Sequence, residues 1–302
     1  MSGAEGSLTI FWVAAALILC AGIALGAAYW GAGIIMHPPD KSPLQVFPEA
    51  YGLPYEKVSF STSDGVALKG WFIPSRTGSD RTLIMCHGWG DNKGYLLERS
   101  YFLNKTAGFN LLYFDNRSHG ESAGRVTTIG CLETIDFEAA IGFLKQNRPS
   151  ALERLGVFGM SMGAAVAILS MPKHPEIKAA VLESPFPDYR NVVRRWAWNN
   201  LRMPYFPMVL LTLLMLRWRV GIPEVDGYSP IAFIPRIAPR PVFIIGGALD
   251  ELMPQEDVVP LFEAAGRARD LAAGLGESGT DARTVRAWLE ILEHACLVVE
   301  LP

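Results

Sequence analysis

Hydrophobic and polar positions divide the chain into two parts of different character. From Leu8 to Met36 there is no charged residue, and the densest apolar stretch runs from Leu8 to Trp30. A helix of that length rises about 34 Å, which is enough to cross a hydrocarbon core of about 30 Å. The pair Tyr29 and Trp30 lies at its end, where aromatic side chains settle at a membrane interface. The pattern therefore predicts a transmembrane helix within residues 1–36.

A cleaved signal peptide is the alternative for this segment. Ala24, Leu25 and Gly26 form a small-x-small sequence of the kind that signal peptidases cleave. However, no Lys or Arg precedes the apolar stretch, and the stretch is longer than the roughly 7–15 residues of a signal-peptide core. These two features favour an uncleaved, single-pass anchor. Lys41 is the first Lys or Arg after the stretch, so the positive-inside rule favours a cytoplasmic location for the rest of the chain.

After a proline-rich segment, short apolar runs alternate with stretches of helix length. The expected strands lie at 55–60, 66–73, 81–87, 109–115, 153–160, 177–183, 239–246 and 284–290, and the expected helices at 92–107, 131–147, 162–171 and 256–268. Runs such as Leu83–Cys86 and Val242–Ile245 are continuously apolar, as in strands that are covered on both faces. The chain is therefore predicted to have an α/β fold, with a mostly parallel eight-stranded sheet and helices on both faces.

One region, residues 188–222, interrupts this alternation. Its longest apolar run, Met208–Leu216, is too short to cross a bilayer. Because the region is inserted between two expected strands, we interpret it as a small helical cap over the site. Two arginines follow the run, so a second contact with the membrane is the alternative. The predicted organisation is a transmembrane anchor at 1–36, an extended tether at 37–54, and an α/β domain at 55–302 that carries the cap.

Composition and charge exclude several classes of function. Half of the 302 residues are hydrophobic, the formal net charge is −3, and no basic run is long enough to hold nucleic acid. The four cysteines form no Cys-x-x-Cys pair and no Cys/His zinc pattern, so neither a disulfide framework nor a structural zinc site is expected. We expect no metal, no cofactor and no nucleic-acid partner. The sequence indicates no particular oligomeric state.

The segment Gly159–Gly163 reads G-M-S-M-G and matches the pattern G-x-S-x-G. It follows an apolar strand and precedes a helix-prone run, which is the strand–turn–helix context of a nucleophile elbow. Glycines two positions before and after the serine leave room for a strained turn. The helix that begins after the serine favours developing negative charge at its N-terminus. We therefore predict that Ser161 is a catalytic nucleophile.

A second glycine-bearing loop follows the expected strand 81–87 and reads H-G-W-G from His87 onward. Acyl transfer needs two N–H donors directed at the oxyanion. The backbone N–H groups of Trp89 and Met162 are the predicted donors. His87 stands at the end of a strand, so we expect it to brace the loop and not to act as the catalytic base.

Taken in order, these features resemble the α/β-hydrolase superfamily. The four segments that carry the resemblance are the histidine–glycine loop at 87–88, the stretch D-N-R-S-H-G-E-S at 115–122, the serine turn at 159–163 and the strand that leads to Asp250. The second of them resembles the D-x-R-x-x-G-x-S sequence of serine aminopeptidases and monoacylglycerol-lipase-like proteins. An apolar N-terminal segment before a single domain is similar to the membrane-anchored, Bem46-like branch. The resemblance covers roughly residues 55–300.

The resemblance implies a catalytic triad in the order serine, acid, histidine. Among the five histidines, only His294 follows both Ser161 and the expected acid. It is therefore the predicted base, which takes the proton from the serine and returns it to the leaving group. Asp250, just past an apolar strand, is the predicted acid that orients the imidazole. Glu183 and Glu251 are the alternative acids.

The expected activity is hydrolysis of carboxylic esters or thioesters through an acyl-enzyme, on acyl or lipid-like substrates at a membrane. A peptidase or amidase of the same fold would use the same groups, although no feature identifies an amine-binding site. A non-catalytic, membrane-anchored binding protein is the alternative of a different class. Two features favour it: Glu293 stands where such hydrolases usually carry glycine, and only eight residues follow His294, too few for the usual terminal helix.

Overall fold

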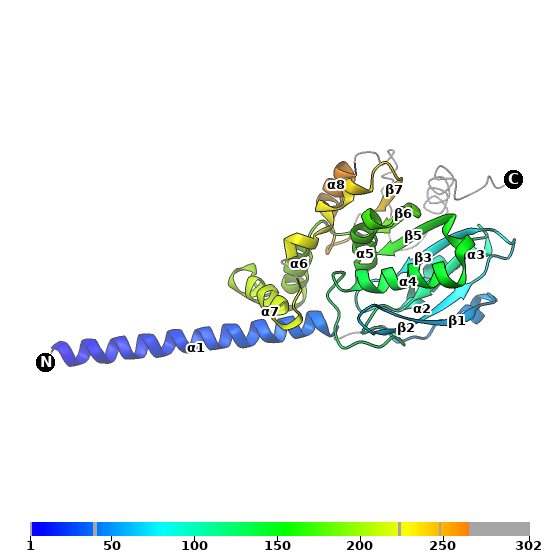
Figure 1. Ribbon diagram of the computed structural model, residues 1–302. Coiled ribbons are helices and arrows are strands. Elements are labelled where there is room, and N and C mark those ends of the chain that lie inside the picture. The colour runs from blue at the N-terminus through cyan, green and yellow to red at the C-terminus, as the bar shows by residue number, and fades with distance from the viewer. Residues whose placement is uncertain (1, 39–40, 223–224, 248, 266–302) are drawn as a thin grey trace.

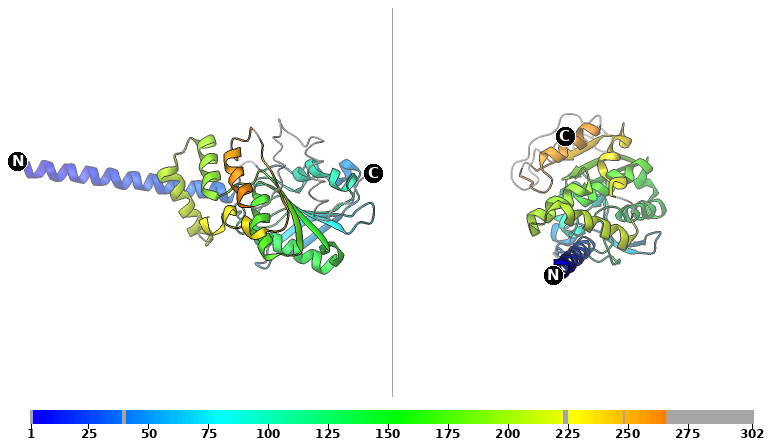
Figure 2. Two further views of the ribbon diagram at one scale, coloured as in Figure 1. Left: turned by 90° about the horizontal axis from the view of Figure 1, so that it is seen from above. Right: turned by 90° about the vertical axis from the view of Figure 1, so that its left-hand side faces the viewer.

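The computed structural model describes residues 2–38, 41–222, 225–247 and 249–265. One long helix, α1 (Ser2–Met36), projects from a domain in which helices cover both faces of a sheet (Figure 1). Figure 2 shows the same arrangement from two further directions, one of them along α1. The α/β fold that the sequence predicts is confirmed.

The sheet is mostly parallel, as predicted. Its strands are β1 (Glu56–Ser61), β2 (Ala67–Ile73), β3 (Arg81–Cys86), β4 (Asn110–Phe114), β5 (Arg154–Met160), β6 (Ile177–Glu183) and β7 (Val242–Ile245). These seven lie in the order β1-β2-β4-β3-β5-β6-β7. β2 pairs antiparallel with β1 and with β4, whereas all other neighbours are parallel. The eighth expected strand, 284–290, lies outside the described residues.

Two apolar cores lie on the two faces of the sheet. The helices that cover them are α2 (Lys93–Ser100), α3 (Phe102–Lys105), α4 (Glu133–Asn147), α5 (Met162–Ser170) and α8 (Gln255–Ala264). α4, α5 and α8 pack on one face, and α2 and α3 on the other. Successive side chains of a strand point to opposite faces. Ile84 and Cys86 of β3 therefore join the first core, while Leu83 and Met85 join the second.

A pair of helices is inserted between β6 and β7. Its elements are α6 (Tyr189–Leu201), a π-helical turn (Tyr205–Val209) and α7 (Leu210–Val220). Asp188 caps α6, because its side chain accepts a hydrogen bond from the Asn191 N–H at 2.8 Å. Apolar side chains of both helices form a third cluster, which also includes residues of α1 and α5. The insertion thus packs against the long helix as well as the domain.

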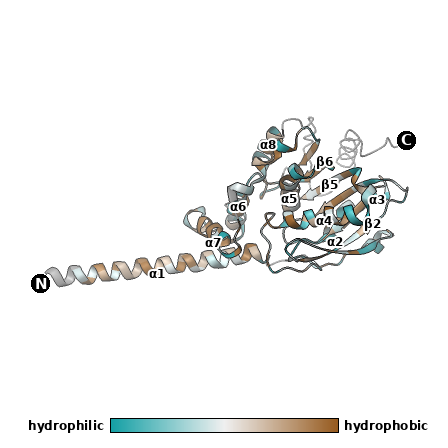
Figure 3. Ribbon diagram, in the orientation of Figure 1, coloured by the Kyte–Doolittle hydropathy of each residue, from teal (hydrophilic) through white to brown (hydrophobic). Residues whose placement is uncertain are grey.

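Helix α1 has two parts with different surroundings. Ser7–Met36 is long and apolar enough to cross a membrane, reaching a mean hydropathy of 2.5, and no other described helix meets that test. Most of it lies away from the domain (Figure 3). Apolar side chains on this part are exposed, Ile23 among them. Toward its C-terminal end, Ala28, Ala32 and Ile35 follow helical spacing and are buried. The last turns, from Gly31 to Met36, contain no exposed residue, so this end of the helix contacts the domain.

The buried side of α1 packs against α7. Gly31 allows the two helices to approach closely, because a Cβ at this position would lie 2.8 Å from the Thr212 Oγ1. Near the end of α7, Arg219 donates a hydrogen bond to the carbonyl of Tyr29 at 3.1 Å. Its guanidinium also lies 4.1 Å from the centroid of the Tyr29 ring, a cation–π geometry. α1 is thus joined to the inserted helices before it reaches the sheet.

The proline-rich segment after α1 runs along the domain over its described part, residues 41–54. The N–H of Ser42 donates to the carbonyl of Gly90 at 2.8 Å. Leu44 packs against the core beneath α2 and α3, and Leu53 is buried in it. The sequence predicts an extended tether at 37–54. Its described part lies against the domain, because its apolar side chains have a core to pack on.

Candidate active site

The carboxyl ends of β3, β5, β6 and β7 meet at one edge of the sheet, which is where ligands bind in open α/β folds. Ser161 follows β5 directly, and Met162 is the first residue of α5. Trp89 lies in the loop after β3, and Asp250 lies shortly past β7. The fold therefore brings four of the five sequence-predicted site residues to one edge. His294, the predicted base, lies outside the described residues.

Ser161 occupies a strained turn between β5 and α5. Its φ of 50° and ψ of −113° lie outside the regions that L-residues favour. A Cβ at Gly159 would lie 2.5 Å from the carbonyl oxygen of Gly163, and a Cβ at Gly163 would overlap the Cys86 carbonyl. Only glycine fits at these two positions. The turn therefore places the serine at the N-terminus of α5.

The two predicted oxyanion donors flank Ser161. The loop after β3 lies beside the serine, because a Cβ on Gly88 would be 3.6 Å from the Ser161 Cβ. Met162 begins α5, and the first N–H groups of a helix have no partner within it. Among the described residues, no acceptor within the protein takes the backbone N–H of Trp89 or of Met162. Within the described part of the chain, nothing competes with a ligand for these two N–H groups.

His87 braces the loop after β3, which is the role that its position predicts. Its Nε2 accepts a hydrogen bond from the Asn116 N–H at 3.0 Å, so its Nδ1 carries the proton that is donated to the Gly88 carbonyl at 2.8 Å. Burial lowers the pKa of His87 to about 3. The imidazole is thus neutral and has both nitrogens engaged, which leaves it no capacity to act as a general base.

The stretch 115–122 is held by buried ion pairs. The Asp115 carboxylate accepts a hydrogen bond from the Lys93 N–H at 2.8 Å and pairs with the ammonium of the same residue. The Arg117 guanidinium donates to the buried Asp136 at 2.9 Å. These charges are satisfied by one another inside the domain. The D-x-R-x-x-G-x-S stretch therefore fixes the loop after β4.

Asp250, the predicted acid, is held in the loop after β7. Its Oδ1 accepts hydrogen bonds from the N–H groups of Leu252 and Met253, at 2.9 and 2.8 Å. These two hydrogen bonds hold the carboxylate in one orientation. An imidazole that reached this loop would meet an oriented carboxylate.

The two alternative acids have different surroundings. Glu183, at the end of β6, pairs with Arg99 at 2.8 Å, and its own carbonyl accepts the Ser161 N–H at 2.8 Å. Burial raises the pKa of Glu183, while the Arg99 charge acts in the opposite direction. Glu251 is exposed. Within the described ranges, no three His, Cys, Asp or Glu side chains come together in a way that could hold a metal ion.

A small apolar cavity of about 160 Å³ opens onto Ser161. Its wall is built from segments far apart in the sequence: α1 (Ile34, Ile35), α6 (Val192, Val193, Trp196) and the loops around them (Trp89, Ile129, Phe186, Leu252). The rings of Trp89 and Trp196 meet edge to face, with their centroids 5.8 Å apart. Predominantly apolar lining beside a few polar groups is typical of sites that bind organic ligands. The contribution of α1 to this wall was not predicted.

A buried glutamate holds the loop that carries Ile129 to the cavity. Ile129 has a φ of 56°, which a branched residue rarely adopts. The Glu133 carboxylate accepts hydrogen bonds from the N–H groups of Thr128 and Gly130, at 2.9 and 2.7 Å. Hydrogen bonds to a charged, buried acceptor are strong, so the carboxylate keeps the loop in this strained form. No motif in the sequence points to this role.

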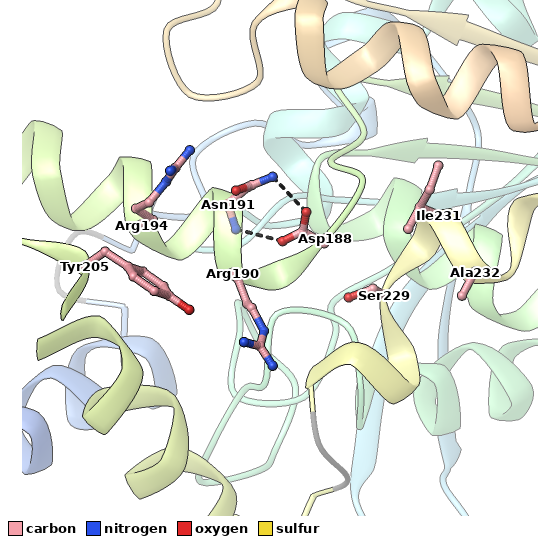
Figure 4. Close-up of a pocket in the computed structure, with 8 residues that line it drawn as sticks. All are labelled: Asp188, Arg190, Asn191, Arg194, Tyr205, Ser229, Ile231 and Ala232. Atoms are coloured by element: carbon pink, nitrogen blue, oxygen red, sulfur yellow. Dashed lines mark hydrogen bonds between the residues drawn. The ribbon is translucent and has the colours of Figure 1, made fainter. Parts of the chain in front are cut away.

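A second hollow, with a volume of about 480 Å³, lies on the other side of α6. Figure 4 shows Arg190 and Arg194 of α6 beside it, together with Tyr205 of the π-helical turn. Val193 of the same helix faces the Ser161 cavity instead. α6 therefore separates the polar hollow from the apolar cavity, and Ser161 lines only the latter.

Comparison with known proteins agrees with this arrangement. A family model described as "Serine aminopeptidase, S33" matches residues 77–220. The uncharacterised protein YfhR of Escherichia coli (strain K12) is 28% identical over 223 residues, which cover 70% of this chain and 68% of YfhR. Protein bem46 of Schizosaccharomyces pombe is 26% identical over 254 residues, which cover 82% of this chain and 79% of bem46.

Among solved structures, the esterase Pf2001 of Pyrococcus furiosus is similar, with a TM-score of 0.67 and 28% sequence identity. The match covers 86% of this chain and 98% of that esterase. The sheet order, the strained serine turn and these likenesses point to one conclusion. The chain belongs to the α/β-hydrolase superfamily and is a hydrolase of the esterase or peptidase type.

Proposed function

We propose that the protein is a serine hydrolase that cleaves carboxylic esters or thioesters, with Ser161 as its nucleophile. The strained turn at Ser161 is the observation that supports this best. A residue in such a conformation costs about 1–3 kcal/mol, and strain of this kind is concentrated at functional sites. The turn lies beside two backbone N–H groups that have no acceptor among the described residues, and it opens onto an apolar cavity. Nucleophile, oxyanion donors and acyl pocket would then share one edge of the sheet.

In the proposed reaction, the Ser161 Oγ attacks the acyl carbonyl carbon while His294 takes the hydroxyl proton. The carbonyl oxygen becomes an oxyanion, which the N–H groups of Trp89 and Met162 stabilise. Collapse of this intermediate expels the alcohol or thiol, which receives its proton from His294, and leaves an ester on Ser161. A water molecule that loses a proton to His294 then hydrolyses the ester. Asp250 orients the imidazole and stabilises its charged form.

The proposed substrates have an apolar acyl part and are small molecules or lipid-like. The lining of the cavity supports this assignment, and so does the likeness to an esterase at 28% identity. Amide hydrolysis would use the same groups, and the match to a serine aminopeptidase family model keeps it as the second candidate. A series of matched p-nitrophenyl esters and p-nitroanilides separates the two, because only the leaving-group atom differs between them.

We also propose that α1 is an uncleaved, single-pass membrane anchor and that the domain lies on the cytoplasmic side. The length and hydropathy of Ser7–Met36 support a membrane span. The absence of Lys and Arg before the span, with Lys41 after it, supports the orientation. The Gly31–Thr212 contact with α7 supports a permanent role for the helix in the folded protein.

The nucleophile is tested by labelling the full-length protein in detergent micelles with a fluorophosphonate, which reacts with activated serines. Wild type is expected to be labelled at one serine per chain, and Ser161→Ala is expected to lose labelling completely. Ser184→Ala is the matched control, because Ser184 also has a positive φ, 47°, at the end of the neighbouring strand. It should label like wild type. A folded wild type that resists labelling would favour a non-catalytic binding protein instead.

A further inference from the structure

We propose that the last turn of α1 is a wall of the acyl-binding cavity, and that Ile34 limits the length of the acyl chain that the protein accepts. This inference rests on the proposed hydrolase function and specifies the substrate of the same site. Ile34 and Ile35 line the cavity together with Ser161. Part of a helix that is apolar enough to cross a membrane is therefore also part of the surface on which the substrate would bind.

The wall is fixed in place relative to Ser161. The indole N–H of Trp89 donates a hydrogen bond to the carbonyl of Ile35 at 3.0 Å. The Thr127 N–H donates to the carbonyl of Met36 at 3.1 Å. Trp89 is the residue whose backbone N–H is the proposed oxyanion donor. The end of α1 is thus bonded directly to the loop that would stabilise the oxyanion, and the distance between this wall and Ser161 is set by the fold.

The size of the cavity indicates a short acyl chain. Its volume is about 160 Å³, whereas pockets for organic ligands usually enclose about 300–1,000 Å³. Ile35 is only 5% exposed and belongs to the packed cluster around α6 and α7. Ile34 is half-buried and is not part of that cluster. A change of side chain at position 34 therefore alters the cavity with little effect on the packing of α1.

The position of the cavity along α1 indicates how far from the membrane surface the substrate would bind. Tyr29 and Trp30 are exposed, and aromatic side chains of a membrane helix settle at the interface. Ile34 follows Trp30 by four residues, which is about 6 Å along a helix. With α1 in a bilayer, the cavity would therefore lie about one helical turn from the membrane surface. The substrate class that fits is an ester or thioester that presents a short acyl group at that surface.

The test measures acyl-chain preference in the full-length protein in phosphatidylcholine nanodiscs. Values of kcat/KM are measured for p-nitrophenyl acetate, butyrate, octanoate and dodecanoate. Wild type is expected to prefer butyrate to octanoate. Ile34→Ala should raise the octanoate-to-butyrate ratio about tenfold, since each methylene that becomes buried contributes about fourfold. Ile34→Trp should lower the butyrate-to-acetate ratio by a similar factor.

Ile23→Ala is the matched control, because it makes the same change on α1 at a residue that is 64% exposed and away from the cavity. Its ratios should equal those of wild type, and stoichiometric labelling of Ser161 by a small fluorophosphonate shows that each variant has an intact site. If wild type is labelled but the Ile34 variants keep its chain-length profile, the wall assignment is overturned and the proposed hydrolase stands. If folded wild type is neither labelled nor active on any ester, the proposed function fails and this inference fails with it.

Discussion

Buried polar side chains hold the loops at the Ser161 edge, and two of them are histidines that could be mistaken for a base. His87 and His119 lie with their ring centroids 5.1 Å apart. The His119 Nε2 accepts a hydrogen bond from the Gly90 N–H at 3.1 Å. His119 thus holds the second part of the loop after β3, as His87 holds its start. Burial lowers the pKa of His119 as well as that of His87. Neutral, fully bonded histidines of this kind act as structural links between strand ends.

The low pKa of His87 predicts a loss of stability in acid. An unfolded chain binds a proton at histidine near its ordinary pKa of 6.5, whereas the folded protein does so only near pH 3. Between these values the unfolded state binds more protons, so the free energy of unfolding falls as the pH falls. His87→Gln should reduce this dependence by about 1.4 kcal/mol per pH unit. Urea unfolding of both proteins between pH 6 and pH 4 measures the two slopes, and equal slopes would contradict the assignment.

At the scale of the elements, the strands and the order in which candidate site residues follow them could be predicted. The packing of α1 against the domain could not. Continuous apolar runs such as Val242–Ile245, bounded by loop residues, mark strands whichever way the chain folds. The side of α1 that packs on α7 has no such mark, because Gly31 and Ala32 are as apolar as the exposed residues around them. Thr212, which lies against Gly31, comes much later in the chain. Periodicity cannot show which face of a wholly apolar helix is covered.

The close approach of α1 and α7 predicts a position-specific effect of bulk. Gly31→Leu should lower the free energy of unfolding by about 2 kcal/mol, because overpacking of a tight contact usually costs about 1–3 kcal/mol. Gly26→Leu makes the same change where a Cβ would meet nothing within 4 Å, and it should have little effect. Thermal unfolding in detergent micelles, followed by fluorophosphonate labelling, compares the two. Equal behaviour of both variants would mean that this helix contact contributes nothing to the fold.

At the scale of the whole molecule, some parts of the candidate site can be recognised in the sequence and others cannot. The strained turn at Ser161 could be predicted because it requires two glycines at fixed spacing. The cavity wall could not, because Ile34, Ile129 and Val193 come together only after folding and carry no motif. Isoleucine and valine in such positions look like ordinary core or membrane residues. The serine turn is thus local in the sequence, while the shape of the cavity depends on long-range contacts.

The proposed anchor predicts the covalent state of the mature protein. Cleavage after Gly26 would remove most of the exposed part of α1 and would still leave Ile34 and Ile35 in the chain. We expect the intact mass of the protein from membranes to include the whole of α1, and we expect the protein to resist extraction by alkaline carbonate. Because we place the domain on the cytoplasmic side, protease added to sealed inverted vesicles should digest it. A mature chain that begins at Ala27 would show a signal peptide instead.

The bond from Arg219 to the Tyr29 carbonyl and the contact of Gly31 with Thr212 would have a kinetic consequence in the proposed membrane-anchored hydrolase. An enzyme on a flexible linker moves through a hemisphere of solution above the bilayer. Its rate therefore depends on the bulk concentration of substrate. A catalytic site that packs against its own membrane helix keeps a constant distance from the bilayer and diffuses only in the membrane plane. Its turnover would then follow the mole fraction of substrate among the lipids, so that diluting the substrate with inert lipid, at constant bulk concentration, would slow the reaction.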